Sequence, residues 1–188
     1  MNDNMARPIV PIPDVPSEPY PLKEASHIVS GFGRGSSDLG IPTANVPIST
    51  LSEEFRSLEP GVYFGFCRLK ENKQTELVQP TKGIERKVVF NYGCELNSDQ
   101  TSTVYPHVMS IGWNPFYNNK EKTAEIHIIN KFSSDFYGAN INFNILGYIR
   151  PELDYTTKEA LIEDINIDIK TALKYLEKRG YKDFSEYL

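Results

Sequence analysis

A two-residue alternation of apolar and polar side chains runs through the middle of the chain and limits its possible folds more than any other feature. Successive side chains of a β-strand point to opposite faces, so this period predicts strands with one buried face. Clusters of glycine, proline, asparagine and serine interrupt the alternation at short intervals, as in antiparallel barrels and sandwiches. The expected strands cover residues 61–69, 86–92, 104–113, 123–130 and 141–149, and the polar residues 70–82 predict a hairpin loop.

The last of these strands has the most regular pattern. Ile141, Phe143 and Ile145 are expected to point inward, and the asparagines at positions 140, 142 and 144 are expected to point outward. We therefore predict one domain over residues 22–188, with the barrel at about 25–150.

The two ends of the chain differ from this middle part. Residues 1–21 hold six of the 13 prolines, which lack an N–H donor and restrict φ. They predict an extended arm, loosely attached or lying over the surface.

Helical signals are concentrated near the C-terminus. Thr156 and Glu159 have the spacing of a capping box, and Gly180 is placed to end the helix. The sequence predicts a helix over about 157–179, whose buried stripe is Leu161, Ile165, Ile169, Ala172, Leu173 and Leu176.

Composition excludes several classes of function. A net charge of −5 and a pI near 5.3 argue against nucleic-acid binding, which needs clustered Lys and Arg. No apolar run approaches the ~20 residues of a membrane span, and the N-terminus lacks a signal-peptide pattern. We expect a cytoplasmic monomer in which Cys67 and Cys94 are reduced thiols.

A glycine-rich segment has the composition of an anion-binding loop. Gly31, Gly33 and Gly35 alternate along it, with Arg34 between the last two and Ser36 after them. Successive N–H groups of such a loop can point at one phosphate, to which an arginine can add a charged contact. The pattern is neither a Walker A motif nor GxGxxG, and a flexible turn before a strand is an equal alternative.

Two further segments carry side chains suited to a metal or to proton transfer. Thr43 and Asn45 share one face of an extended segment and offer uncharged oxygens to a cation such as Mg²⁺. Glu125 lies mid-strand between apolar neighbours, where it can accept a proton from a hydroxyl. Alternatively, Thr43 and Asn45 are simply polar side chains at the surface of a strand. Glu125 can likewise lie on a solvent-exposed sheet face, where it forms an ion pair with a neighbouring strand.

Aromatic and basic residues near loops leave two interpretations open. Phe136 and Tyr137 can stack on a planar ring or plug the end of a barrel. Arg150, held extended by the proline that follows, can reach a ligand or pair with a surface carboxylate.

Taken together, the segments resemble the riboflavin kinase family, the flavokinases that make FMN. The resemblance spans roughly residues 28–152 and rests on GFGRGSSDLGIPTAN, GVYFG, SIGWNPFY, AEIHI, DFYG and ILGYIRPE, in that order. It implies a mainly β fold, a six-stranded antiparallel Greek-key barrel with a C-terminal helix packed on it. It also implies a kinase that uses ATP and Mg²⁺, with Zn²⁺ as an alternative ion, to phosphorylate riboflavin.

The resemblance assigns roles residue by residue. Thr43 and Asn45 become metal ligands, and Glu125 activates the ribityl hydroxyl. ATP contacts fall on Gly31, Gly33, Arg34, Gly35, Ser36, Phe136 and Tyr137, and flavin contacts fall on Asn118, Thr123 and Arg150.

The match to the family has limits. The 70–103 region is longer and more polar than in the family, so it receives no role. The chain lacks the length of a fused adenylyltransferase domain, so FMN is the expected final product. The alternatives are a non-catalytic flavin- or nucleotide-binding barrel and an OB-like nucleic-acid binder.

Overall fold

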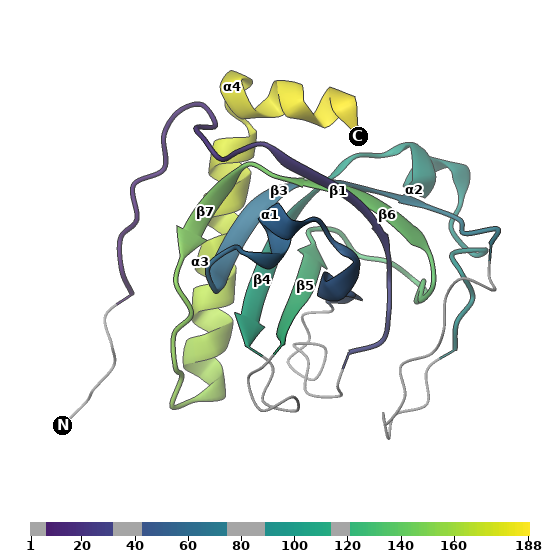
Figure 1. The fold of residues 1–188 in the computed structure, drawn as a ribbon, viewed down its shortest axis with the longest axis horizontal. Coiled ribbons are helices and arrows are strands. Elements are labelled where there is room, and N and C mark those ends of the chain that lie inside the picture. The colour runs from purple at the N-terminus through teal and green to yellow at the C-terminus, as the bar shows by residue number, and fades with distance from the viewer. Residues whose placement is uncertain (1–6, 32–42, 75–88, 114–120) are drawn as a thin grey trace.

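Seven strands form one antiparallel sheet in the computed structural model, which describes residues 7–31, 43–74, 89–113 and 121–188 (Figure 1). They pair in the order β1-β6-β3-β4-β5-β2, with β7 also on β3. The strands are β1 (Leu22–His27), β2 (Ala44–Val46), β3 (Gly61–Lys70), β4 (Tyr105–Trp113), β5 (Lys122–Ile128), β6 (Asn140–Ile145) and β7 (Gly147–Arg150).

β6 and β7 are two halves of one bent strand. β6 pairs with the second half of β3 and β7 with the first half, and between them the Leu146 N–H donates to the Phe64 carbonyl at 2.9 Å. Counted in this way, six antiparallel strands curl into a half-barrel. Val29, just after β1, donates its N–H to the Asn45 carbonyl of β2 at 2.9 Å and so links the outer edges of the sheet.

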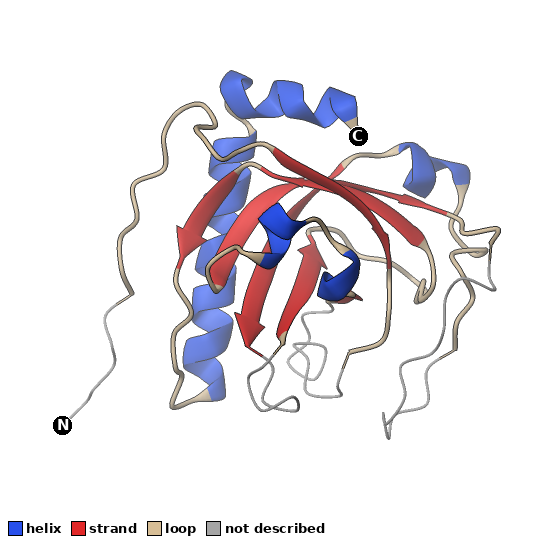
Figure 2. Ribbon diagram, viewed as in Figure 1, coloured by secondary structure: helices blue, strands red, loops and turns tan. Residues whose placement is uncertain are grey.

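Short helices lie between β2 and β3 and between β3 and β4, and the remaining helices follow β7. The helical elements are η2 (Ile48–Thr50), α1 (Glu53–Arg56), α2 (Ser98–Ser102), α3 (Lys158–Leu176), α4 (Arg179–Lys182) and η5 (Asp183–Tyr187). Figure 2 shows α3 as the long blue helix behind the strands, with the C-terminal helices across one end. The expected mainly β fold with a packed C-terminal helix is confirmed, but α1 and α2 show that helix is not confined to the C-terminus.

Two apolar clusters lie on opposite faces of the sheet. The inner cluster fills the half-barrel, where Phe55 of α1 packs edge-on against Phe143 with ring centroids 5.4 Å apart. The outer cluster joins Phe64 and Val108 to Ala172 and other residues of the C-terminal helices. Because β3 is covered on both faces, its burial is nearly continuous rather than alternating.

The outer cluster explains why Asn144 is buried although the alternation predicts an outward position. Its side-chain oxygen accepts the Phe66 N–H at 2.8 Å, and its amide donates to the Phe184 carbonyl at 3.3 Å. The His107 ring nitrogen lies 2.9 Å from the Asn144 carbonyl, and burial lowers the pKa of His107 to about 4. The outward face at this point is therefore an interior polar junction beneath the C-terminal segment.

α3 begins slightly later and ends slightly earlier than the helix predicted over about 157–179. Thr157, not Thr156, caps the helix, and its hydroxyl accepts the Ala160 N–H at 3.2 Å. Gly180 lies inside α4 rather than ending α3, and its lack of a Cβ leaves room for Val15 of the N-terminal arm. Leu173 is 36% exposed, since the packed face of the helix carries Asp168, Ala172 and Leu176 instead.

The expected strand over residues 86–92 is wrong in its described part. Residues 89–92 are irregular, and Tyr92 has a left-handed φ of 57°. The Asn91 side-chain oxygen accepts the Gly93 N–H at 2.9 Å, which forms an Asx turn in place of a strand. Residues 86–88 lie outside the described part.

The proline-rich arm contacts the C-terminal helices over its described residues. The Tyr181 hydroxyl donates to the Pro13 carbonyl at 2.7 Å, and Lys178 pairs with Asp14. Arg7 reaches two carboxylates of α3. In the described ranges, no helix is long and apolar enough to cross a bilayer.

The junction at Asn144 makes a stability prediction. Asn144→Ala leaves the buried Phe66 N–H and Phe184 carbonyl without their partner, so unfolding free energy is expected to fall by ~1–3 kcal/mol. Urea denaturation measures this, with Asn140→Ala at an exposed position of the same strand as the control. Equal losses in both variants would contradict the assignment of Asn144 as a junction.

Candidate functional site

Asn45 and Glu125 face each other across the antiparallel pairing of β2 with β5. They are direct register partners, between the pairs Ala44–Ile126 and Val46–Ala124. Those flanking residues are buried in the inner cluster, so the side chains of Asn45 and Glu125 both point to the outer face. Directly opposed residues have Cβ atoms about 4.5–5.5 Å apart, which brings an amide and a carboxylate within reach of one ligand.

Gly31 lies against the side chain of Asn45 and leaves room for it because glycine has no Cβ. A Cβ added at Gly31 would lie 2.5 Å from the Asn45 amide nitrogen, so any other residue would displace that side chain. Thr43 precedes β2 and is partly buried, two positions from Asn45 in an extended segment. The first predicted ATP residue, Gly31, therefore packs against one predicted metal ligand, Asn45, and the other, Thr43, lies next to β2 in the chain.

Glu125 is partly buried at mid-strand, and burial raises its pKa above the usual value of a glutamate. Within the described part of the chain, no hydrogen bond or ion pair reaches its carboxylate. A carboxylate that is poorly solvated and not neutralised is a stronger base than a free one. This is the electrostatic setting in which a glutamate can take a proton near neutral pH.

On the other side of Glu125 lies β4, whose Ser110 is its register partner. The next outward pair is Gly112 with Thr123, the predicted flavin residue. The Glu152 carboxylate, from the loop after β7, occupies the space over Gly112 where a Cβ would stand. Burial, with the nearby Asp154 adding to it, raises the pKa of Glu152.

The predicted nucleotide aromatics lie at a turn that is bonded to the chain just before Gly31. The Gly138 N–H donates to the Ile28 carbonyl at 2.7 Å. Phe136 packs against Phe132 at 4.9 Å, and Tyr137 against Phe90 at 5.8 Å, both partly buried. The turn thus borders the site, and both rings also have packing partners.

Arg150 has a different partner from the ligand that the resemblance implies. It is 4% exposed, and its guanidinium donates to Asp168 of α3 at 2.9–3.1 Å. Its Nη1 donates to the Pro151 carbonyl at 3.2 Å. In this arrangement Arg150 holds the following loop, and its contact with flavin stays a prediction.

Five predicted site residues lie outside the described part of the chain, namely Gly33, Arg34, Gly35, Ser36 and Asn118. Conversely, the sequence motifs assign no role to Ser110, Glu152, Asp168 or Arg7. Ser110 begins the quoted SIGWNPFY segment and Glu152 ends ILGYIRPE, which are local signals, whereas the contacts of Asp168 and Arg7 depend on helix docking and on the long-range position of the arm.

Thr43 and Asn45 are the predicted ligands of a divalent ion. Thr43 and Asn45 supply neutral oxygens, and the Asn45 amide occupies the space that the missing Cβ of Gly31 leaves. In the described ranges, no group of three or more His, Cys, Asp or Glu residues could hold a metal. The residues fit a weakly held Mg²⁺ that shares substrate phosphates better than a closed zinc site.

Comparison with known proteins agrees with this class of fold. A family model described as "Flavokinase: Riboflavin kinase" matches residues 18–176. The chain is 56% identical over 183 residues to a riboflavin kinase of Scheffersomyces stipitis, covering 97% of this chain and 99% of that protein. It is 54% identical over 181 residues to a riboflavin kinase of Saccharomyces cerevisiae, covering 95% of this chain and 83% of that protein.

A solved structure has the same fold. The riboflavin kinase from Trypanosoma brucei is similar with a TM-score of 0.58 at 22% identity, over 88% of this chain and 86% of that chain. The half-barrel with its packed helix is the fold of this class, and the family model and the sequence identities assign the chain to one family within it. This chain belongs to the riboflavin kinase family.

The raised pKa of Glu125 predicts a pH-dependent change in stability. Since the folded protein holds this proton more tightly than the unfolded chain, parent stability falls as pH rises above about 4.3, the usual glutamate pKa, through the raised value. Glu125→Gln removes this loss, so its melting temperature is expected to exceed that of the parent at pH 8 and to approach it near pH 4. Thermal melts at both pH values measure the difference. A Gln variant less stable than the parent at pH 8 would contradict the unneutralised carboxylate.

Proposed function

We propose that this protein transfers the γ-phosphoryl group of ATP to the ribityl 5′-hydroxyl of riboflavin, giving FMN and ADP. Relatives named riboflavin kinase align with it over nearly its whole length. The observation that carries the proposal is the register pairing of Asn45 with Glu125 on one outward face. It joins an oxygen ligand suited to a metal–phosphate group with a base suited to an alcohol.

Glu125 would orient the hydroxyl and accept its proton as the new P–O bond forms. Its partial burial supports this role, because the raised pKa makes the carboxylate a better base than an exposed one. Direct in-line transfer needs positioning and charge stabilisation more than covalent help. A phosphorylated Glu125 would add a step that nothing in the site requires.

Thr43 and Asn45 would hold a divalent ion, Mg²⁺ or Zn²⁺, beside the ATP phosphates. When bound, such an ion neutralises charge on the phosphate oxygens. Gly31, with Gly33, Arg34, Gly35 and Ser36, would cover the phosphates with backbone N–H groups and one guanidinium. Phe136 and Tyr137 would border the nucleotide, while Asn118 and Thr123 would lie on the flavin side.

A non-catalytic flavin- or nucleotide-binding barrel is the main alternative. The two functions differ in turnover, so the protein is mixed with riboflavin, ATP and Mg²⁺. A kinase produces ADP and a more acidic flavin in equal amounts, whereas a binding module produces neither.

Glu125→Gln tests the proposed base. The amide keeps the size of the side chain but cannot accept the proton, so kcat is expected to fall by ~10²–10⁴-fold with little change in KM for ATP. Steady-state FMN formation measures this, with Glu163→Gln on the exposed face of α3 as the matched control. Near-normal turnover of Glu125→Gln would remove Glu125 from the chemistry.

Asn45→Ala tests the proposed metal–phosphate contact. Loss of one contact to a charged group is worth ~1.5–3 kcal/mol, so the affinity for Mg-ATP is expected to fall by ~10–100-fold. Calorimetric titration with Mg-ATP measures the affinity, and Asn166→Ala at an exposed position of α3 is the control. Equal affinities of parent and Asn45→Ala would show that Asn45 does not hold the nucleotide.

A further inference from the structure

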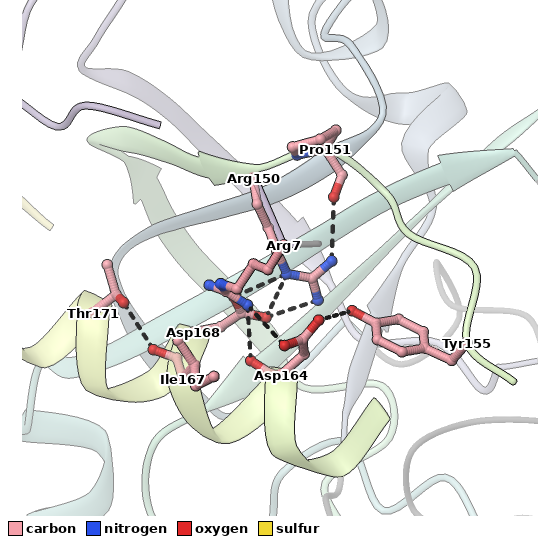
Figure 3. A network of polar contacts seen from close by, with 8 residues as sticks. All are labelled: Arg7, Arg150, Pro151, Tyr155, Asp164, Ile167, Asp168 and Thr171. Carbon is pink, nitrogen blue, oxygen red and sulfur yellow. Dashed lines mark hydrogen bonds and ion pairs between the residues drawn. The ribbon is translucent and has the colours of Figure 1, made fainter. Parts of the chain in front are cut away.

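A buried acid on α3 joins two segments that are far apart in the sequence. Asp168 is 2% exposed, and Arg150 of β7 donates from Nε and Nη2 to its two oxygens at 3.0 and 2.9 Å. Arg7 of the N-terminal arm donates to the same carboxylate from Nη2 at 2.6 Å. Figure 3 shows the two guanidinium groups converging on this side chain.

A second acid, one helical turn earlier, extends the contacts. Arg7 Nη1 donates to the Asp164 backbone carbonyl at 3.3 Å and lies 3.6 Å from its Oδ1. The Tyr155 hydroxyl donates to Asp164 Oδ2 at 2.7 Å (Figure 3). We call Arg7, Arg150, Tyr155, Asp164 and Asp168 the arginine–aspartate network. Its two cations balance its two anions, as a low-dielectric setting requires.

The network fixes both ends of the loop formed by residues 151–155. Arg150 Nη1 donates to the Pro151 carbonyl at 3.2 Å, and Tyr155 is held by Asp164 at the other end. Between these anchors, the Glu152 carboxylate lies over Gly112 of β4. The loop therefore borders the same outer face that carries Glu125.

The geometry of in-line phosphoryl transfer indicates which of the two substrates, phosphate donor or acceptor alcohol, lies beneath the 151–155 loop. The attacking and leaving oxygens lie on opposite sides of the transferred phosphorus. In the sheet, Asn45 of β2 is on one side of Glu125, and Ser110 of β4 is on the other. A phosphate donor beside Asn45 leaves the β4 side, next to Gly112 and Glu152, for the body of the acceptor alcohol.

We propose that Arg7 is a positioning residue for the acceptor, because it ties the arm to the network that holds the 151–155 loop against β4. This rests on the proposed kinase function. Among the described residues, removal of Arg7 takes from Asp164 its ion-pair partner and leaves Asp168 with Arg150. The Asp164 side chain then loses the contact that orients it toward Tyr155, so this anchor becomes less ordered while the fold persists. The loop then samples more positions, and a small misplacement of a substrate-orienting group costs binding and rate.

Arg7→Ala in the full chain tests the proposal through the two substrates separately. KM for riboflavin is expected to rise by about 10-fold, with KM for ATP within about 2-fold of the parent. Arg7→Lys restores a charge but not the forked contact with both acids, so it is expected to recover part of the affinity. A purely stabilising role would lower the melting temperature and leave the KM for riboflavin unchanged.

Asp14→Ala is the matched control, because it removes another contact of the same arm, the pair with Lys178, without touching Asp164 or Asp168. Both KM values of this variant are expected to equal those of the parent. A rise in riboflavin KM equal to that of Arg7→Ala would show that general attachment of the arm, not Arg7, matters and would overturn the proposal.

Amide hydrogen exchange of the loop gives a readout that does not depend on turnover. Peptides covering residues 152–156 are expected to exchange about 10-fold faster in Arg7→Ala and unchanged in Asp14→Ala. Unchanged exchange in Arg7→Ala, or equal rises in both KM values, would overturn the proposal. If the parent fails to phosphorylate riboflavin, the proposed function fails, and the exchange rates still decide whether Arg7 fixes the loop.

Discussion

The antiparallel register of β2 with β5 is the constraint on which the site depends. Side chains alternate between faces, so a slip of β2 by one residue would turn Asn45 into the apolar interior, expose Ala44 and Val46, and remove the amide from Glu125. The buried flanking residues therefore hold the polar pair outside. Packing of the core and geometry of the site are two consequences of the same pairing.

The outer face of the sheet is covered by helices over some strands and carries polar side chains over others. Over β3 and β4 the outer face is covered by the C-terminal helices, which buries Phe64 and Val108 and encloses Asn144. Over β2 and β5 the same face carries Asn45, Glu125 and Thr123 instead. The long helix thus packs over one half of the sheet, and the proposed site lies on the other half, with the 151–155 loop at the border.

Two carboxylates that lie away from solvent, those of Asp168 and Glu125, differ in whether a cation neutralises them. Asp168 is fully compensated by two arginines, and its charge links the arm, β7 and α3. Glu125 lacks such compensation in the described part of the chain, and burial raises its pKa. Uncompensated burial costs stability, which is the common sign of a group retained for chemistry rather than for folding.

The sequence by itself determined the mainly β class, the strand positions of 61–69 and 123–130, the C-terminal helix and the segments that match the family, because these follow from local periodicity and motifs. It misjudged the burial of Asn144, the cap at Thr157 and the position of Gly180, since each depends on what packs there. Only the tertiary structure decided that Asn45 opposes Glu125, that Glu152 covers Gly112 and that Arg150 faces Asp168. Those contacts join residues distant in sequence, and strand register and helix docking, not local preference, bring them together.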